Sequence, residues 1–231
     1  YYFRMKISII IVNYNGETYL ADCLTSILNS NTQYDYEIIV VDNQSSDGSV
    51  AVLEKFKSSC KIILNHNNSG FAKANNIGVA NTTGDYFFFL NNDTVLPTDT
   101  LAKLPALLSE QSDVDVIVPK LVNADQSLQA PGGIFTRSRF KSSTPRKISF
   151  AAGAAILISR QAYAAVGGFD NSYFFYNEDV DLCKSLLKKG YAIYYDPRVS
   201  VTHFGGLATS FRKYHSIIEG YRGGFYLCKK F

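Results

Sequence analysis

Hydrophobic positions in the first 90 residues alternate between short continuous runs and helically spaced patterns. The continuous runs are rich in β-branched and aromatic residues, as in strands that are buried on both faces. They lie at 7–12, 37–41, 61–64 and 85–90. Between them, apolar residues recur with helical spacing at 17–28, 47–56 and 71–80. Strands that alternate with helices predict a parallel sheet with right-handed crossovers.

The second half of the chain has a less regular pattern. It predicts helices at 98–108, 160–166 and 178–189, and strands at 114–118, 191–195 and 199–203. The run 150–158 is apolar and small, whereas 123–147 is rich in Gly, Pro, Ser and basic residues and is expected to be a long loop. We therefore expect one α/β domain over residues 1–231, with a parallel core and mixed strands later.

Length and composition narrow the class of protein. The chain has 231 residues, 46% of them hydrophobic and 19% charged, with a formal net charge of +3. These values are typical of a globular domain and argue against a disordered chain; the small charge gives no sign of a nucleic-acid binder. The most hydrophobic early run has six residues, 7–12, which is too short for a signal peptide or a membrane span. The four scattered cysteines predict reduced thiols and a cytoplasmic location. They are Cys23, Cys60, Cys183 and Cys228.

Charge is concentrated at the end of the chain. Segment 211–231 contains five Lys or Arg residues and one Glu, a net charge of +4, together with six aromatic residues. Basic residues and aromatic rings favour the surface of an anionic membrane. The alternative is a helix that packs on the domain.

Polar residues follow each of the four early strands. The four segments are 13–16, 42–48, 65–70 and 91–94, and they are rich in Asn, Asp, Ser and Gly. Such residues also form turns and helix N-caps, which is the alternative for any one of them. Because ligands of parallel α/β sheets bind at the carboxyl ends of the strands, four such segments at one edge favour a binding crevice.

Two aspartates in these segments have plausible ligands. Asp42 could accept the imide N–H of uracil or thymine, and the backbone N–H groups of 68–70 could meet phosphate. Neither the P-loop nor the G-x-G-x-x-G motif is present. Asp93 follows an aromatic strand and could bind a divalent ion that bridges a diphosphate, because Mg²⁺ or Mn²⁺ needs only one or two protein carboxylates there. Alternatively Asp93 or Thr94 caps the helix beyond Pro97.

Three carboxylates lie at the start of the helix at 178–189. They belong to Glu178, Asp179 and Asp181, and the aromatic run 173–176 precedes them. A carboxylate beside a partly desolvated wall could act as a general base. Alternatively the acids complement the helix dipole, with Asn177 as the cap. His203 follows the last strand and is either structural or a metal ligand.

Taken in order, these segments resemble family 2 glycosyltransferases of the GT-A fold, in a bacterial rhamnosyltransferase-like branch. The resemblance extends from about residue 6 to residue 203. The matching segments are 9–16 (IIIVNYNG), 40–49 (VVDNQSSDGS), 68–78 (NSGFAKANNIG), 89–94 (FLNNDT), 167–170 (GGFD), 178–182 (EDVDL) and His203. This sequence has Asn91 where many relatives have Asp.

The resemblance implies a role for each matching residue. Those expected to hold the nucleotide sugar are Asn13, Asn15, Asp42, Asn68, Gly70, Asn75, Asn76, Asn91, Asn92 and Glu178. Asp93 is expected to bind Mn²⁺ or Mg²⁺ in place of the family's D-x-D motif, with His203 in the metal shell. Asp179 is expected to deprotonate the acceptor hydroxyl.

The implied activity is an inverting transfer from a UDP- or dTDP-sugar to a saccharide or lipid-linked saccharide, in cell-surface polysaccharide synthesis. Residues 6–95 would bind the nucleotide sugar and 96–210 the acceptor, while 211–231 would associate with the inner face of the plasma membrane. The alternatives are a nucleotidyltransferase and a non-catalytic nucleotide-sugar-binding module. Segment 13–16 has no Lys or Arg, unlike the basic glycine-rich loop expected of the former, and Asp93 and Asp179 argue against the latter. The pattern does not specify the donor sugar, the acceptor or the linkage.

Overall fold

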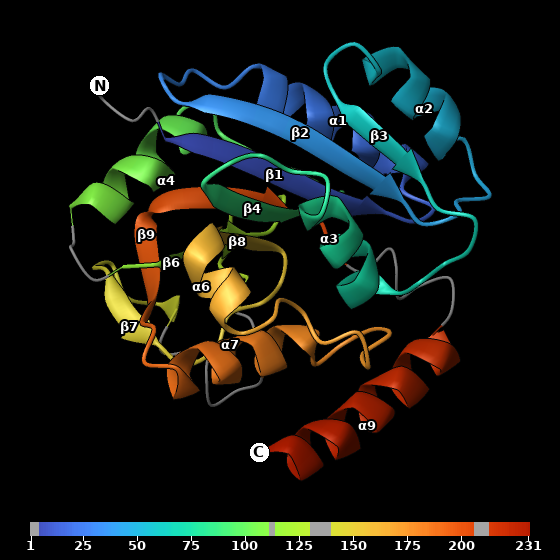
Figure 1. Ribbon diagram of the computed structural model, residues 1–231. Coiled ribbons are helices and arrows are strands. Elements are labelled where there is room, and N and C mark those ends of the chain that lie inside the picture. Colours follow the sequence, from blue (N-terminus) through green and yellow to red (C-terminus); the bar gives the residue numbers. More distant parts are fainter. Residues whose placement is uncertain (1–4, 111–113, 130–139, 206–212) are drawn as a thin grey trace.

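In the residues that the structure describes, a nine-stranded sheet forms the centre, with helices on both faces (Figure 1). This computed structural model describes residues 5–110, 114–129, 140–205 and 213–231. The strands are β1 (Lys6–Asn13), β2 (Asp35–Asp42), β3 (Lys61–Leu64), β4 (Tyr86–Asn91), β5 (Thr94–Val95), β6 (Val116–Val122), β7 (Arg146–Ile148), β8 (Ala155–Ser159) and β9 (Ile193–His203). The helices are α1 (Glu17–Leu28), α2 (Ser49–Phe56), α3 (Phe71–Val79), α4 (Thr100–Ser109), α6 (Arg160–Ala165), α7 (Glu178–Lys188) and α9 (Lys213–Lys230).

The first half of the chain forms the predicted parallel sheet. Strands β3, β2, β1 and β4 are adjacent and parallel. Asn13 pairs with Asp42, and Val12 pairs with Asn91, so β1, β2 and β4 end at the same edge of the sheet. The polar segments that follow these strands therefore meet there, as predicted.

The later strands make the sheet mixed, which was also predicted. Strand β8 runs antiparallel to β4 and to β6, whereas β6 runs parallel to β9. The two strands predicted at 191–195 and 199–203 are one strand, β9, whose pairing with β6 shifts register between Pro119 and Lys120. Strands β5 and β7 were not predicted, because two or three residues are too few to show a periodic pattern.

The aromatic strand β4 divides its side chains between the two faces. Phe88 and Leu90 pack in the core beneath α1 and α4, and Phe87 and Phe89 pack in the core beneath α6 and α7. All four are at most 2% exposed. This double burial explains why the sequence of β4 is a continuous apolar run.

One of the alternatives based on helix caps is wrong, and the other is confirmed only for the position of Asn177 before the acidic first turn of α7. Helix α4 begins at Thr100 with Asp99 as its N-cap residue, so neither Asp93 nor Thr94 caps it. Asn177 precedes α7, but it has a left-handed backbone and its side chain makes no capping hydrogen bond. Its amide donates instead to the Gly220 carbonyl of α9 (2.9 Å).

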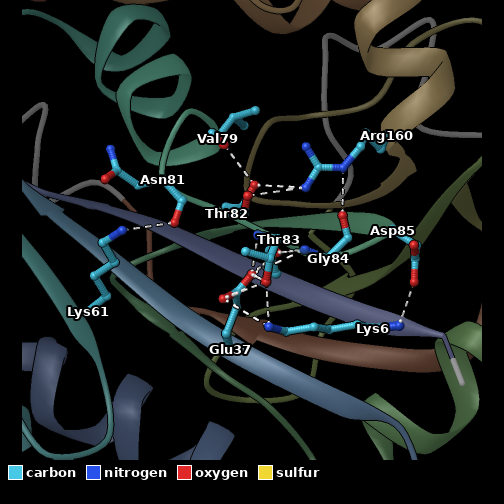
Figure 2. Close-up of polar contacts among 11 residues, drawn as sticks. Lys6, Glu37, Lys61, Val79, Asn81, Thr82, Thr83, Gly84, Asp85 and Arg160 are labelled. Carbon is cyan, nitrogen blue, oxygen red and sulfur yellow. Dashed lines mark hydrogen bonds and ion pairs between the residues drawn. The ribbon is translucent and has the colours of Figure 1, made fainter.

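A polar network fixes the edge of the sheet opposite the predicted crevice (Figure 2). Glu37 Oε1 accepts hydrogen bonds from Ser8 Oγ and the Thr83 backbone N–H, both at 2.6 Å, and Oε2 forms an ion pair with Lys6 (3.2 Å). Arg160 donates to the Gly84 carbonyl (2.7 Å). These contacts hold the loop between α3 and β4 against the start of β1 and β2.

The basic C-terminal segment is helical from Lys213 to Lys230, and α9 lies beside the segment that precedes α7 (Figure 1). The predicted alternative of a helix packed on the domain is therefore confirmed for this part. Residues 206–212, and 130–139 of the predicted loop, lie outside the described residues. Within the described part of the chain, no helix is long and apolar enough to cross a membrane. Cys23, Cys60, Cys183 and Cys228 are free thiols, as expected.

Candidate functional site

The ends of β1 and β2 form a buried polar corner. Asn13 donates to Asp42 Oδ2 (3.2 Å) and to Ser45 Oγ (3.1 Å), and it accepts from Asn92 Nδ2 (2.7 Å). Asp42 also accepts the Ser45 backbone N–H (3.0 Å). Asn13 and Asp42 are almost fully buried, so each is held in one orientation. Three predicted nucleotide-binding residues, Asn13, Asp42 and Asn92, thus lie in one hydrogen-bonded cluster.

Asn15 holds the turn beside this corner. Its backbone has a positive φ of 51°, and its Oδ1 accepts the Ser46 backbone N–H (2.8 Å). Its own backbone N–H donates to Ser45 Oγ (2.9 Å). Asn tolerates this left-handed conformation better than most residues. The segments after β1 and β2 therefore form one linked surface.

The segment between β3 and α3 is held by Asn43. The Asn43 amide donates to Asn68 Oδ1 (2.8 Å) and to the Gly70 carbonyl (3.3 Å), while its Oδ1 accepts the Ser69 N–H (3.0 Å). Gly70 has a φ of 82°, and a Cβ there would lie 2.5 Å from the carbonyl oxygen of Phe174. Only glycine fits this position, so Gly70 brings the loop against the segment that leads to α7.

Two predicted nucleotide-binding residues of α3 have internal partners. Asn75 is buried and donates to the Phe71 carbonyl (3.0 Å) within its own helix. Asn76 donates to the Phe169 carbonyl (2.7 Å) and accepts from the Tyr163 hydroxyl (2.6 Å). Asn76 thus ties α3 to the loop before α7. Their contact with a nucleotide stays a prediction.

Asp93 and His203 converge where β4 and β5 meet the end of β9. His203 Nε2 lies 3.2 Å from Asp93 Oδ1 and 3.2 Å from Asn91 Nδ2. His203 Nδ1 lies 2.5 Å from Gln129 Oε1. Gln129 directs its amide nitrogen to the His203 carbonyl (3.2 Å), which leaves its oxygen facing the ring. Because the Gln129 oxygen can only accept, Nδ1 is the donor in this contact, and Nε2 is the ring nitrogen that faces Asp93.

This pair of residues fits a divalent cation. In a neutral His203 protonated at Nδ1, Nε2 and the Asp93 oxygen 3.2 Å away would both be acceptors, and a cation between them would satisfy both. A metal-binding imidazole usually has its orientation fixed by a hydrogen bond from its other ring nitrogen, and His203 Nδ1 makes such a bond to Gln129. The other Asp93 oxygen accepts the Gly205 N–H (3.1 Å), which orients the carboxylate. Two protein ligands suffice where phosphate oxygens and water complete the shell.

Asp179 lies in the first turn of α7 with its carboxylate fixed by backbone donors. Oδ2 accepts the Gly153 N–H (3.2 Å) and Oδ1 accepts the Val180 N–H (2.8 Å). Burial raises the pKa of Asp179. Burial and the neighbouring Asp179 charge raise the pKa of Glu178 to about 8, and Glu178 Oε2 has no partner among the described residues. Raised carboxyl pKa values and an unsatisfied buried oxygen are typical of functional sites.

Gly153 and Ala154 connect Asp179 to the metal-binding pair. The Ala154 carbonyl accepts the backbone N–H of Asn91 (3.0 Å), two residues before Asp93. The adjoining Gly153 N–H donates to Asp179. The carboxylate at the start of α7 is thus two hydrogen bonds along the backbone from the end of β4. The structure brings Asp93, His203 and Asp179 to the same edge of the sheet.

Three residues that contact the candidate site or the first turn of α7 were not predicted from the sequence. Gln129 and Gly153 lie in segments without a readable pattern, and Lys230 lies in the basic tail. Lys230 forms ion pairs with Asp170 and Asp181, both at 2.8 Å. Neither a glycine N–H nor a distant lysine has a local sequence signal.

A comparison with protein families decides the classification. Residues 8–167 match the model described as glycosyl transferase family 2. This chain belongs to glycosyl transferase family 2. The matched range contains the polar segments after β1, β2, β3 and β4, so most of the residues of the predicted crevice lie within the family match.

Relatives and solved structures agree with the family. The chain is 29% identical over 124 residues to the poly(ribitol-phosphate) β-N-acetylglucosaminyltransferase TarS of Staphylococcus aureus, a match covering 52% of this chain and 22% of that protein. The chain therefore spans only part of the curated relatives it matches. It resembles GalNAc-T7 with UDP, GalNAc and Mn²⁺ (TM-score 0.72, 18% identity, 88% of this chain and 44% of that one). It also resembles the mannosyltransferase PcManGT of Pyrobaculum calidifontis with GDP-Man and Mn²⁺ (TM-score 0.72, 17% identity, 97% and 65%). The fold is the GT-A fold of these enzymes.

Proposed function

We propose that this family 2 glycosyltransferase moves a sugar from a UDP- or dTDP-sugar to a hydroxyl group of a saccharide or lipid-linked saccharide, with inversion at the transferred carbon. The observation that carries the proposal is the backbone link from Asp179 through Gly153 and Ala154 to the end of β4. It puts one candidate base and one candidate metal pair at a single edge of the sheet.

Asp179 acts as the general base in this proposal. Its raised pKa brings the carboxylate closer to the acceptor hydroxyl in proton affinity, which favours proton removal in the transition state. The Gly153 and Val180 N–H groups stop the carboxylate from rotating away. A single displacement with one base on the far face of the sugar inverts the anomeric carbon. Glu178, protonated at neutral pH, can donate a hydrogen bond to the bound sugar or diphosphate.

Asp93 and His203 hold Mn²⁺ or Mg²⁺ in this proposal. Bound there, the cation would neutralise charge on the diphosphate leaving group. Gln129 keeps the His203 ring turned toward Asp93, and the Gly205 N–H orients the Asp93 carboxylate. Asn91, at the position where many relatives have Asp, places its amide nitrogen 3.2 Å from His203 Nε2 and adds no second negative charge.

The nucleoside binds beside Asn13 and Asp42, where the carboxylate can accept the imide N–H of uracil or thymine. Support for UDP comes from GalNAc-T7, whose solved structure contains UDP with Mn²⁺. Support for a cell-surface polymer as acceptor comes from TarS, which is named for poly(ribitol phosphate). Neither the family model nor these relatives name rhamnose, so the rhamnosyltransferase-like branch stays a prediction.

The outer face of α9 associates with an anionic membrane in this proposal. Ile218, Tyr221 and Phe225 follow one another at helical spacing and are 50–72% exposed. A lipid-linked acceptor would lie at such a surface, which agrees with the expected location at the inner face of the plasma membrane.

Release of UDP or dTDP tests the proposal. The wild-type chain is incubated with UDP-glucose, UDP-N-acetylglucosamine and dTDP-rhamnose in Mn²⁺, with water as the acceptor, and free nucleotide is measured. We expect release from at least one donor, and EDTA or Asp93→Ala should abolish it. Exposed Asp125 offers a matched control, because Asp125→Ala should leave release unchanged. Full release in EDTA would exclude the metal, and no release or binding of any donor would exclude the function.

A further inference from the structure

Lys230, near the end of α9, connects two acidic residues on either side of the loop that leads to the candidate base. Its ammonium group lies 2.8 Å from Asp170 Oδ2 and 2.8 Å from Asp181 Oδ1. Asp170 comes before the aromatic segment 173–176, and Asp181 lies in the first turn of α7, two residues after Asp179. One side chain thus joins both ends of the segment 170–181.

The Lys230 bridge supplies the positive charge that neutralises a buried carboxylate. The Asp181 side chain is only 3% exposed, and its other hydrogen bond comes from the Tyr173 hydroxyl (3.2 Å). Burial would raise the pKa of Asp170, but the hydrogen bonds led by that from Lys230 outweigh it and hold the pKa at about 2. Without Lys230, two carboxylates would remain close together, and one of them would be a buried charge without a cation. A buried charge that loses its partner is strongly unfavourable.

Other contacts dock α9 on the same segment. The Tyr226 hydroxyl donates to Asp170 (3.0 Å), and its ring packs edge-on against Tyr173 at 5.2 Å between centroids. The Asn177 amide donates to the Gly220 carbonyl (2.9 Å). A Cβ on Gly223 would lie 2.8 Å from that amide, so the helix approaches the loop closely at a glycine.

The segment itself has little other support on the side of α9. Tyr176 and Asn177 both have positive φ values, 68° and 70°, which few non-glycine residues adopt without external restraint. A cavity of about 270 Å³ is lined by residues 172–176 on one side and by α9 on the other. The helix carries three glycines, at 220, 223 and 224, so it depends on docking more than on its own propensity.

We propose that Lys230 is a positioning residue, whose bridge between Asp170 and Asp181 fixes the first turn of α7 and thereby the Asp179 carboxylate. The inference rests on the proposed role of Asp179. Loss of the bridge would let the start of α7 shift relative to Gly153, whose N–H orients Asp179. Misplacement of a catalytic group by about 1 Å can cost as much as 10²-fold in rate.

Three variants of the full chain distinguish a positioning role of Lys230 from a non-specific effect of positive charge on α9. Lys230→Met removes the charge and keeps the length, and Lys230→Arg restores a charge that can reach both carboxylates. Lys229→Met removes an exposed cation from the adjacent position and serves as the control. Thermal melting of each variant establishes that it is folded.

Hydrogen exchange of backbone amides 173–182 is measured first, because it does not depend on activity. We expect at least 10-fold faster exchange in Lys230→Met, near wild-type exchange in Lys230→Arg, and no change in Lys229→Met. Equal exchange in Lys230→Met and Lys229→Met would overturn the proposal.

Kinetics then separate positioning from stability. For nucleotide release from UDP-sugars in Mn²⁺, we expect Lys230→Met to lower kcat at least 10-fold with donor KM within about 2-fold, and Lys230→Arg to recover most of kcat. Unchanged kcat, or a loss that Arg does not recover, would contradict positioning. A parallel Asp179→Asn variant separates failure of the proposed base from failure of the proposed role of Lys230. If Asp179→Asn keeps the wild-type rate, Asp179 is not the base. The hydrogen-exchange result still decides whether Lys230 fixes segment 173–182.

Discussion

Adjacent carboxylates at the start of α7 differ in their surroundings, and these differences assign their roles. Asp179 is held by the Gly153 and Val180 N–H groups, so its ionised form has donors. Glu178 is 6% exposed and has an oxygen without a partner in the described part of the chain. Asp181 is neutralised by Lys230 and is used for structure. We therefore propose three roles for these chemically similar groups: Asp179 as the base, Glu178 as a neutral donor and Asp181 as an anchor.

Glu178 should make the protein less stable as pH rises. Its folded pKa of about 8 lies above the ordinary value of 4.5, so folding favours the protonated form. Its contribution to the free energy of unfolding is therefore present below about pH 4.5 and is lost as pH rises through 8. Between pH 5 and 8, we expect the free energy of unfolding to fall less steeply with pH in Glu178→Gln than in the wild type. The two slopes should differ by up to about 1.4 kcal/mol per pH unit. Urea unfolding at several pH values measures this.

The dependence of the free energy of unfolding on pH could also contradict this prediction. Parallel curves for wild type and Glu178→Gln would show that Glu178 is ionised at neutral pH, and its proposed role as a hydrogen-bond donor would be wrong. Exposed Glu54→Gln controls for the loss of a carboxylate in general.

At the scale of elements, the loop between α3 and β4 is fixed by one carboxylate. Burial would raise the pKa of Glu37, but hydrogen bonds from Ser8, Thr83 and Lys6 lower it to about 2. The stabilisation is present above the ordinary value of 4.5 and is lost as pH falls toward 2. Glu37→Gln should destabilise the protein by about 1–2 kcal/mol at pH 7.

Urea unfolding at pH 7 and at pH 3 checks this prediction, with Glu54→Gln as the matched control. Glu54 is 63% exposed and pairs with Lys57 on the same helix, so its loss should cost little. We expect the difference between wild type and Glu37→Gln to shrink at pH 3. If the two Gln variants are equally stable at pH 7, the network of Figure 2 does not fix the loop.

The elements of the first half could be predicted because their sequence signals are local. Helix α1 and strand β3 have the predicted bounds, and the others among the first seven differ by at most two residues at either end. Buried parallel strands impose continuous apolar runs, and helices impose a spacing of three or four. Parallel strands also place the polar segments that follow β1, β2 and β4 at one edge of the sheet. Asn13, Asp42 and Asp93 could therefore be predicted as candidate site residues.

Contacts between distant segments could not be predicted. His203 needs Gln129 to fix its ring, and Asp179 needs Gly153, yet neither partner has a local pattern. Strand β9 was predicted as two strands because Pro197, within it, is typical of a break. The structure keeps the strand continuous by shifting its register with β6.

At the scale of the whole molecule, the exposed apolar residues are concentrated on α9. It carries Ile217, Ile218, Tyr221 and Phe225 at 49–72% exposure. Patches of this kind usually mark an interaction surface. Lys184 and Lys188 of α7 contact the Phe231 ring just beyond α9, so cations lie near the end of this helix. A basic aromatic surface suits anionic lipid, and each cation near it contributes about 1 kcal/mol.

Vesicle flotation tests this surface. The wild type should bind phosphatidylglycerol vesicles at low salt and phosphatidylcholine vesicles weakly. Tyr221→Ser with Phe225→Ser should reduce binding at least 10-fold, whereas Val50→Ser, on exposed α2, should not. No binding to anionic vesicles would remove the membrane proposal, and a concentration-dependent dimer would assign the surface to a second copy instead.

The central claim is that Asp179 removes a proton from the acceptor while residues at the strand ends hold the donor. Single-turnover release of nucleotide in Mn²⁺, together with donor Kd, tests it in wild type, Asp179→Asn and Glu178→Gln. Asn keeps the shape but cannot take a proton at neutral pH, and a positioned base contributes about 10²–10⁴-fold. We expect a loss of that size in Asp179→Asn with donor Kd within about 2-fold. A rate above about a tenth of the wild-type rate would show that Asp179 is not the base.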